Sequence, residues 1–320
     1  MHRVHLMCSE CLFVWSITNL TVAARCRFRV PVASGLDLRT VLFSHGWIDL
    51  EPFDWDEATG VFSTPVDIDG VAVDVTCRQT TSGLAVVVDS RRALSKARRA
   101  SARDLLPYML RLDECLDDFW AKCAQTPRLA WVSRRGAGRI FRAPSVFEDL
   151  MKLLFTTNCS WAATRLMTSR LVEALGVRAP SGRQAFPTAA ACAAQDEAFY
   201  RDVVRAGYRA KSCVSLAGRF ASGELYDDWF TDRSLSLDQV RERLLSIAGF
   251  GPYAAGQAMR LLGHYKDLAL DSWCRAKLLE MAGNKRTPSD QAVAKRYARF
   301  DPFDGLALWM DLTADWFGEN

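Results

Sequence analysis

Residues 244–277 read LLSIAGFGPYAAGQAMRLLGHYKDLALDSWCRAK, and this stretch decides the fold. It begins at the end of a predicted helix, which Ser236 and Gln239 open with a capping box and which carries an apolar stripe. Gly249 provides the positive φ at which helices commonly end. Pro252 suits the first position of a second helix, where its missing N–H is not needed. The pattern therefore predicts two helices joined by a glycine hairpin.

The predicted hairpin leaves unpaired backbone N–H groups at the start of its second helix. Gly251 keeps side chains out of the turn, so these groups and the positive end of the helix dipole attract a phosphate. Asp271 follows twenty residues later and opens a further predicted helix, SWCRAKLLEMAG. A phosphate site and a carboxylate at a fixed separation suit a protein that grips a nucleic-acid backbone while acting on one nucleotide.

This arrangement resembles the helix-hairpin-helix glycosylase superfamily of base-excision DNA repair, in which the hairpin precedes a catalytic aspartate. Three other segments match elements of the 8-oxoguanine and alkylpurine DNA glycosylases in the same order. They are GRIFRAPSVFEDLMKLLFTTNCSW at 138–161, FPTAAACAAQ at 186–195 and GYRAKSCVSLAGRF at 207–220. The resemblance covers residues 136–280 and implies an α+β protein, with an N-terminal antiparallel sheet domain followed by an all-helical glycosylase domain. It makes a DNA-binding hairpin of Gly249, Phe250, Gly251 and Tyr253.

The residue pattern supports the same division of the chain. Alternating apolar segments predict an antiparallel sheet domain at 27–103, with hairpin turns at Asp69-Gly70 and Ser82-Gly83 and a helix near 36–47. The glycosylase domain is expected at 104–320. Its helices are predicted at 105–123, 146–156, 162–175, 199–205, 211–222, in the hairpin pair, after Asp271 and at 305–317.

Residues 1–26 combine a basic start with a short apolar patch, which raises a signal peptide as an alternative. Polar residues interrupt and flank the patch, and it is too short to span a membrane. We therefore expect a poorly ordered extension.

A carboxylate favours glycosidic cleavage, because breaking the bond between base and deoxyribose leaves positive charge on the sugar. A carboxylate beside the sugar stabilises that charge and activates the attacking water. Asp271 is the candidate. Aspartate before a helix is also a common N-cap, and the two roles are compatible.

A lysine found in part of the superfamily is missing here. Bifunctional members carry it in the first turn after the hairpin, where it attacks the sugar as a Schiff-base nucleophile. Through GFGPYAAG this position is Tyr253, whose phenol cannot form an iminium, and Lys266 is out of register. We therefore expect a monofunctional glycosylase without AP-lyase activity, in which Tyr253 lines the pocket or only packs.

The resemblance also assigns residues that fill the gap left by a flipped-out base. Asn158 matches the gap-filling asparagine, while Tyr208 and Arg209 match the wedge aromatic and the arginine that contact the orphaned base. The alternatives are a loop asparagine that caps the next helix and an ordinary Tyr-Arg turn. The second arginine of the 8-oxoguanine branch falls on Ala163, so strict selection of an opposite cytosine is not expected.

The substrate is predicted from aromatic side chains, which hold alkylated, electron-poor bases by their faces. The candidate walls are Phe250, Tyr253, Trp161, Trp273 and Trp309. Gln257 and Trp273 stand where the 8-oxoguanine branch has a cysteine and a histidine. These differences favour an alkylated purine. An 8-oxoguanine-like enzyme and a catalytically inactive damage-binding protein are the alternatives.

Composition sets further bounds on partners and cofactors. Six cations and no acid lie in the range from Arg91 to Arg103, and arginines follow at 134, 135, 139 and 142. These basic residues form either a DNA-binding face or a solvated surface. The 10 cysteines and 4 histidines contain one CxxC and no metal-ligand cluster, and no cysteine follows Cys274. We expect no iron–sulfur cluster, metal or other cofactor. The expected protein is a cytoplasmic, nucleoid-associated monomer that binds damaged double-stranded DNA and no membrane.

Overall fold

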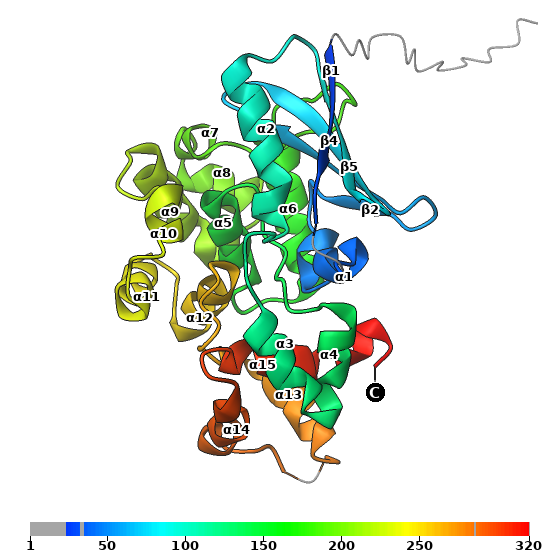
Figure 1. Ribbon diagram of the computed structural model, residues 1–320. Helices are drawn as coiled ribbons and strands as arrows, with labels where there is room; N and C mark the ends of the chain where they lie inside the picture. Colours follow the sequence, from blue (N-terminus) through cyan, green and yellow to red (C-terminus); the bar gives the residue numbers. More distant parts are fainter. Residues whose placement is uncertain (1–23, 33–34, 285, 320) are drawn as a thin grey trace, which may run out of the picture.

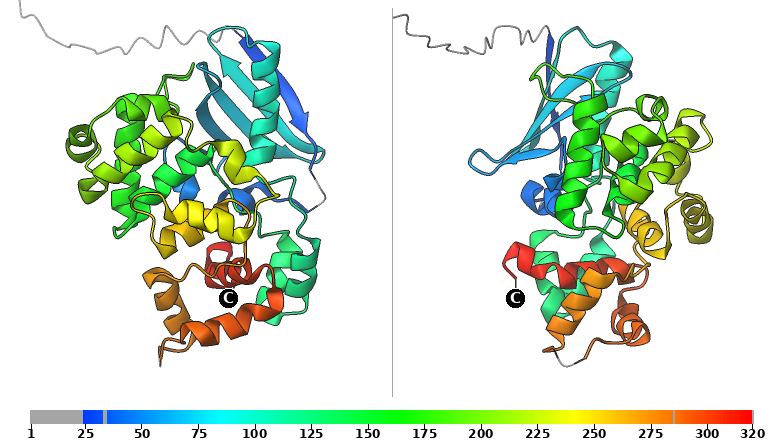
Figure 2. Two further views of the ribbon diagram at one scale, coloured as in Figure 1. Left: turned by 90° about the vertical axis from the view of Figure 1, so that its left-hand side faces the viewer. Right: turned by 180° about the vertical axis from the view of Figure 1, so that it is seen from behind.

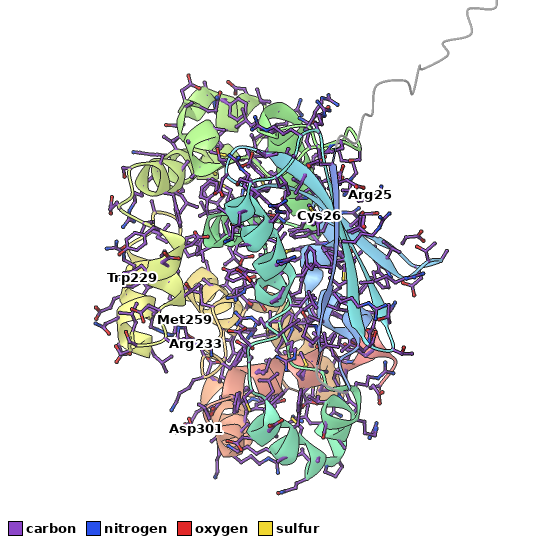
Figure 3. The ribbon with its side chains drawn as sticks, turned by 45° about the horizontal axis from the view of Figure 1, so that its top comes forward. Arg25, Cys26, Trp229, Arg233, Met259 and Asp301 are labelled. Carbon is purple, nitrogen blue, oxygen red and sulfur yellow. The ribbon has the colours of Figure 1, made fainter. Side chains whose placement is uncertain are left out.

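The computed structural model describes residues 24–32, 35–284 and 286–319. Residues 1–23 of the expected extension lie outside this range. Ala24, Arg25 and Cys26 belong to the first strand, so the sheet starts three residues before the predicted boundary. Arg25, in the sheet, and Asp301, near the C-terminal helices, lie on opposite sides of the view in Figure 3.

The N-terminal part is an antiparallel sheet of five strands in the order β1-β5-β4-β3-β2. The strands are β1 Ala24–Val30, β2 Asp54–Asp56, β3 Val61–Asp67, β4 Ala72–Thr80 and β5 Gly83–Ser90. In β4 and β5 the apolar residues alternate with partly exposed ones, and Val75 and Val86 are almost fully buried. This alternation builds one buried face, and α2 (Lys96–Met109) lies against the sheet (Figure 2).

Both predicted hairpins are present, one of them shifted by a residue. Asp69 and Gly70 have φ of 49° and 77°, as a two-residue hairpin turn with two left-handed residues requires. In the second hairpin Gly83 already pairs with Thr80. The loop there is Thr81-Ser82 rather than the predicted Ser82-Gly83.

The rest of the described chain is mainly helical (Figure 1). The α-helices besides α2 are α1 Leu38–Leu42, α3 Asp117–Ala124, α4 Ala130–Arg135, α5 Val146–Thr156, α6 Trp161–Leu175, α7 Ala189–Ala193, α8 Glu197–Asp202, α9 Ala210–Ala221, α10 Asp227–Thr231, α11 Leu237–Leu245, α12 Pro252–Leu261, α13 Ser272–Met281, α14 Asp290–Tyr297 and α15 Asp304–Leu312. The short 3₁₀ helices are η1 Gly46–Asp49, η2 Pro127–Leu129, η3 Gly207–Arg209, η4 Ala298–Phe300 and η5 Ala314–Phe317. None of these described helices is long and apolar enough to cross a membrane.

The predicted helix at 105–123 is wrong. The chain ends α2 at Met109, turns through Arg111 with a φ of 52°, and starts α3 only at Asp117. In addition, α2 starts at Lys96, with Ser95 as its N-cap, and therefore crosses the predicted boundary at residue 103. The apolar side of α2 packs on the sheet, so this helix belongs structurally to both parts. The helices α4, α7, α10 and α14 were not predicted.

Helix α5 is the centre of the helical part, and α6, α9 and α12 pack around it (Figure 1). Its lysine, Lys152, is buried and pairs with Glu148 at 2.6 Å. Its Asp149 carboxylate accepts hydrogen bonds from Trp47 Nε1 at 2.7 Å and from the Ala143 N–H at 2.9 Å. Trp47 comes from η1, so this bond ties the N-terminal part to the helical core.

Candidate active site

The hairpin forms as the sequence predicts. Both capping-box hydrogen bonds of Ser236 and Gln239 are present at the start of α11. Gly249 has a φ of 87°, and Pro252 is the first residue of α12. The first N–H of α12 that bonds to a backbone carbonyl is that of Ala255, which donates to Gly251 at 3.0 Å. The preceding amides remain available as donors, as expected at a helix N-terminus.

The outer side of the turn is open. Gly251 is exposed, and a Cβ added to it would have no described atom within 4 Å. A phosphate can therefore approach the backbone directly. Phe250 is 6% exposed and anchors the turn in the core. It does not line the cavity described below, so its prediction as a pocket wall is wrong.

Asp271 caps α13, and it also lies at a cavity. Its Oδ1 accepts a hydrogen bond from the Cys274 N–H at 2.7 Å, so the capping role is real. The residue is half-buried and lines a cavity of about 1120 Å³ together with Tyr253 and Gln257. The volume lies slightly above the range of about 300–1,000 Å³ that is usual for ligand pockets. The hairpin helix α12 thus connects the open turn to the cavity.

The walls of the cavity come from segments that are far apart in sequence. Residues 43–49 contribute from the N-terminal part, 156–164 from the end of α5 and the start of α6, and 309–316 from the C-terminal helices. Three tryptophans cluster there: the centroid of Trp273 is 5.5 Å from that of Trp309 and 5.7 Å from that of Trp316. Of the predicted walls, Trp161, Trp273, Trp309 and Tyr253 all line the cavity.

Tyr253 occupies the place of the missing lysine, in the first turn of α12. Burial, together with the smaller effect of the Asp271 carboxylate, raises the pKa of its phenol to about 12, so the phenol stays protonated at neutral pH. No lysine lines the cavity in the part of the chain that the structure describes. Lys266 is exposed and forms an ion pair with Asp301 at 2.7 Å.

Arg260 and His45 are among the polar residues of the cavity that were not predicted. Arg260 is buried on α12 and donates from Nη1 to Gln257 Oε1 at 2.6 Å. The sequence could have indicated this residue, because it is the charged residue within the otherwise apolar run 258–262. His45 donates from Nε2 to the Phe141 carbonyl, and burial lowers the pKa of His45 to about 3, so the ring is neutral at physiological pH. No local pattern around His45 indicates a site.

The three residues assigned to the gap and the opposite base lie together, and one of them, Asn158, lines the cavity. Asn158 has a φ of 47°, is exposed, and donates from Nδ2 to Tyr208 Oη at 3.3 Å. Tyr208 is 68% exposed. The cap of α6 is Ser160, which accepts from the Ala163 N–H, so the capping alternative for Asn158 is wrong.

Arg209 is placed differently from its two neighbours. It is 7% exposed, its guanidinium donates to Thr157 Oγ1 at 3.1 Å and to the Thr157 carbonyl, and it stacks on Tyr208 at 4.5 Å. In this arrangement Arg209 holds the loop that carries Asn158.

The expected basic face is smaller than the sequence indicated. Arg139 and Arg142 are buried, and they donate to main-chain carbonyls instead of facing solvent. Arg134 and Arg135 both pair with Glu319, at 3.1 Å and 2.9 Å. Buried cations and paired cations offer little to DNA phosphates. Within residues 24–32, 35–284 and 286–319, no group of three or more His, Cys, Asp or Glu side chains is placed to hold a metal ion.

The overall fold is similar to that of solved DNA glycosylases. A 3-methyladenine DNA glycosylase from Archaeoglobus fulgidus matches with a TM-score of 0.72 and 18% identity, over 91% of this chain and 99% of that one. MBOgg1 in complex with a low-affinity DNA ligand matches with a TM-score of 0.68 and 17% identity, over 92% and 96% of the two chains. The chain has the helix-hairpin-helix DNA glycosylase fold.

An 8-oxoguanine glycosylase/lyase from Clostridium acetobutylicum shares this glycosylase fold, with a TM-score of 0.66 and 18% identity over 87% of this chain and 93% of that one. No family model matches the sequence, and no curated protein matches it. The glycosylase fold is therefore common to proteins named for different damaged bases.

Proposed function

We propose that the protein is a monofunctional DNA glycosylase of base-excision repair. It flips a modified purine out of double-stranded DNA and hydrolyses the N-glycosidic bond with the help of Asp271. The observation that carries the proposal is the position of Asp271. It lines a cavity large enough for a base, and Tyr253, in the first turn after the open hairpin, lines the same cavity.

The hairpin and the exposed loop residues supply the grip on DNA. The free amides at the start of α12 bind a backbone phosphate. Asn158 and Tyr208 enter the space left by the flipped nucleotide, since both are exposed and hydrogen-bonded to each other. Arg209 is a positioning residue that fixes this loop through Thr157. The protein is proposed to work as a monomer, where its DNA substrate is found, on the nucleoid.

The reaction then follows from the charges at the cavity. The bond between C1′ and the purine nitrogen breaks, and its electron pair leaves with the base. The resulting cation-like deoxyribose is stabilised by the Asp271 carboxylate. A water oxygen attacks C1′, its proton passes to Asp271, and the product is an abasic site.

Tyr253 supports the monofunctional assignment. A protonated phenol cannot form the iminium that links bifunctional enzymes to DNA. Its side chain instead forms part of the cavity wall, and Trp273 and Trp309 provide further aromatic surface. Stacking on these walls supports an alkylated purine as the substrate class.

Duplexes that contain 3-methyladenine, hypoxanthine, 1,N6-ethenoadenine or 8-oxoguanine test the proposal, with analysis before and after hot alkali. Cleavage only after alkali supports the monofunctional enzyme. Strand cutting without alkali contradicts the Tyr253 argument, and release of 8-oxoguanine alone contradicts the alkylpurine assignment. Tight binding with no release of any base identifies a damage-binding protein.

A further inference from the structure

Arg260 is the one lysine or arginine among the described residues that line the cavity. It is 3% exposed. A guanidinium has five N–H donors, and described residues accept two of them, at Gln257 Oε1 (2.6 Å) and at the Leu268 carbonyl (3.4 Å). Its Nε is buried without a partner in the described part of the chain. A buried cation with unused donors is destabilising by itself, and its presence in a cavity wall points to a role towards the ligand.

The cavity therefore carries opposite charges. Asp271 is half-buried, while Arg260 is buried in the part of the cavity wall that α12 forms. The second acidic residue at the cavity, Asp49, is exposed and accepts from Trp161 Nε1 at 3.1 Å. His45 is neutral, so it does not add to the positive charge. Burial lowers the pKa of Arg260, but a guanidinium starts so high that it stays charged at neutral pH.

Arg260 also occupies an aromatic surface that would hold a cationic base. Its guanidinium carbon lies 4.7 Å from the centroid of the Trp309 ring. One face of this tryptophan is thus already engaged in a cation–π contact. A second cation in the same cavity would be repelled at short range and low dielectric constant.

The charge of the damaged base decides whether a buried cation helps. A purine methylated at N3 or N7 is positively charged in DNA and leaves as a neutral molecule. A neutral purine receives the electron pair of the C1′–N9 bond, becomes an anion, and then takes a proton from water. Fixed positive charge stabilises the second kind of leaving group and opposes binding of the first kind.

We propose that Arg260 is a specificity-determining residue that selects neutral modified purines over cationic methylpurines. Hypoxanthine and 1,N6-ethenoadenine, an alkylated but neutral base, are the expected substrate class. The inference rests on the proposed glycosylase function and narrows its substrate. Gln257 is the positioning residue, because its Oε1 fixes the guanidinium.

Single-turnover release from duplexes with hypoxanthine, 1,N6-ethenoadenine, 3-methyladenine and 7-methylguanine tests this, with each rate divided by the spontaneous rate. The wild-type protein should give larger enhancements for the two neutral bases. Arg260→Met should lower neutral-base release by about 100-fold, the loss seen when one preorganised charge-stabilising group is removed. Arg260→Lys, which keeps the charge, should retain the preference. Thermal melting and affinity for an abasic-site duplex report on folding.

The failures of the two proposals are distinguishable. If the wild-type protein releases none of the four bases and no 8-oxoguanine, the glycosylase proposal fails. If it releases cationic bases with the larger enhancement, only the role of Arg260 is overturned, and this result needs no variant. An equal loss on all four bases in Arg260→Met, with normal melting, also overturns it, because it indicates a general structural role.

Discussion

Asp271 combines two roles that a single substitution can separate. As the N-cap of α13 it accepts the Cys274 N–H at 2.7 Å, and as a cavity residue it is proposed to stabilise the charged sugar. Asparagine caps a helix about as well as aspartate but carries no charge. The change Asp271→Asn therefore removes the chemistry and leaves the cap.

The expected magnitudes are far apart. Loss of a general base lowers a rate by about 10²–10⁴-fold, or about 2.7–5.4 kcal/mol at about 1.36 kcal/mol per factor of ten. Loss of one negative charge beside the α13 N-terminus lowers the free energy of unfolding by only about 0.3–1 kcal/mol. Asp271→Ala removes the cap as well, and adds about 1 kcal/mol of destabilisation.

The assay is single-turnover base release, combined with urea unfolding of the same samples. Asp196 is a matched control, because it caps α8 by accepting the Phe199 N–H at 2.8 Å and does not line the cavity. Asp196→Ala should lose about 1 kcal/mol of stability and keep full base release. If Asp271→Asn releases base at the wild-type rate, the carboxylate takes no part in the reaction and the catalytic assignment is refuted.

Three further predictions concern the hairpin, the core and the missing lyase step. Gly249→Ala should lower the free energy of unfolding in urea by about 1–3 kcal/mol, because φ is 87° and the new Cβ would lie 2.8 Å from Ser212 Oγ. The control is Gly218→Ala in α9, where the new Cβ would have no described atom within 4 Å. It should leave that free energy unchanged or raise it by up to about 1 kcal/mol. Burial raises the pKa of Asp149 to about 7, above its value in the unfolded chain. Between about pH 4 and 7 the folded state therefore holds a proton that the unfolded state has released. The free energy of unfolding consequently falls as the pH rises through this range. Asp149→Asn should reduce that fall when unfolding is compared at pH 5 and pH 8; an unchanged slope would show that Asp149 titrates normally. Borohydride should trap no covalent DNA complex with the wild-type protein, since Tyr253 cannot form an iminium; a trapped complex would reveal an unrecognised amine nucleophile.

Several elements could be predicted because their causes are local. The range 146–156 was predicted as a helix and is α5, and the hairpin forms around Gly249 and Pro252 as expected. Caps, glycines with positive φ and prolines at helix starts act within a few residues, so the sequence shows them directly. The capping role of Asp271 is local in the same sense.

The errors occur where burial decides the outcome. The start of α2 at Lys96 was missed, because cations dominate residues 91–103 and the apolar side of the helix is evident only once it packs on the sheet. Arg209 matched a DNA contact by sequence, but the structure buries its guanidinium against Thr157. A sequence records the charge of an arginine and does not record whether carbonyl groups from distant segments surround it.

The sequence by itself determined the hairpin, the capped helix that Asp271 opens and the absence of a lysine at position 253, because short-range backbone geometry and residue identity are sufficient for each. Only the tertiary structure decided that His45, Trp316 and Arg260 share one cavity with Asp271. These residues are brought together by packing between the N-terminal part, the hairpin and the C-terminal helices. Such contacts are non-local, so the charge that the cavity presents to a base depends on the whole fold.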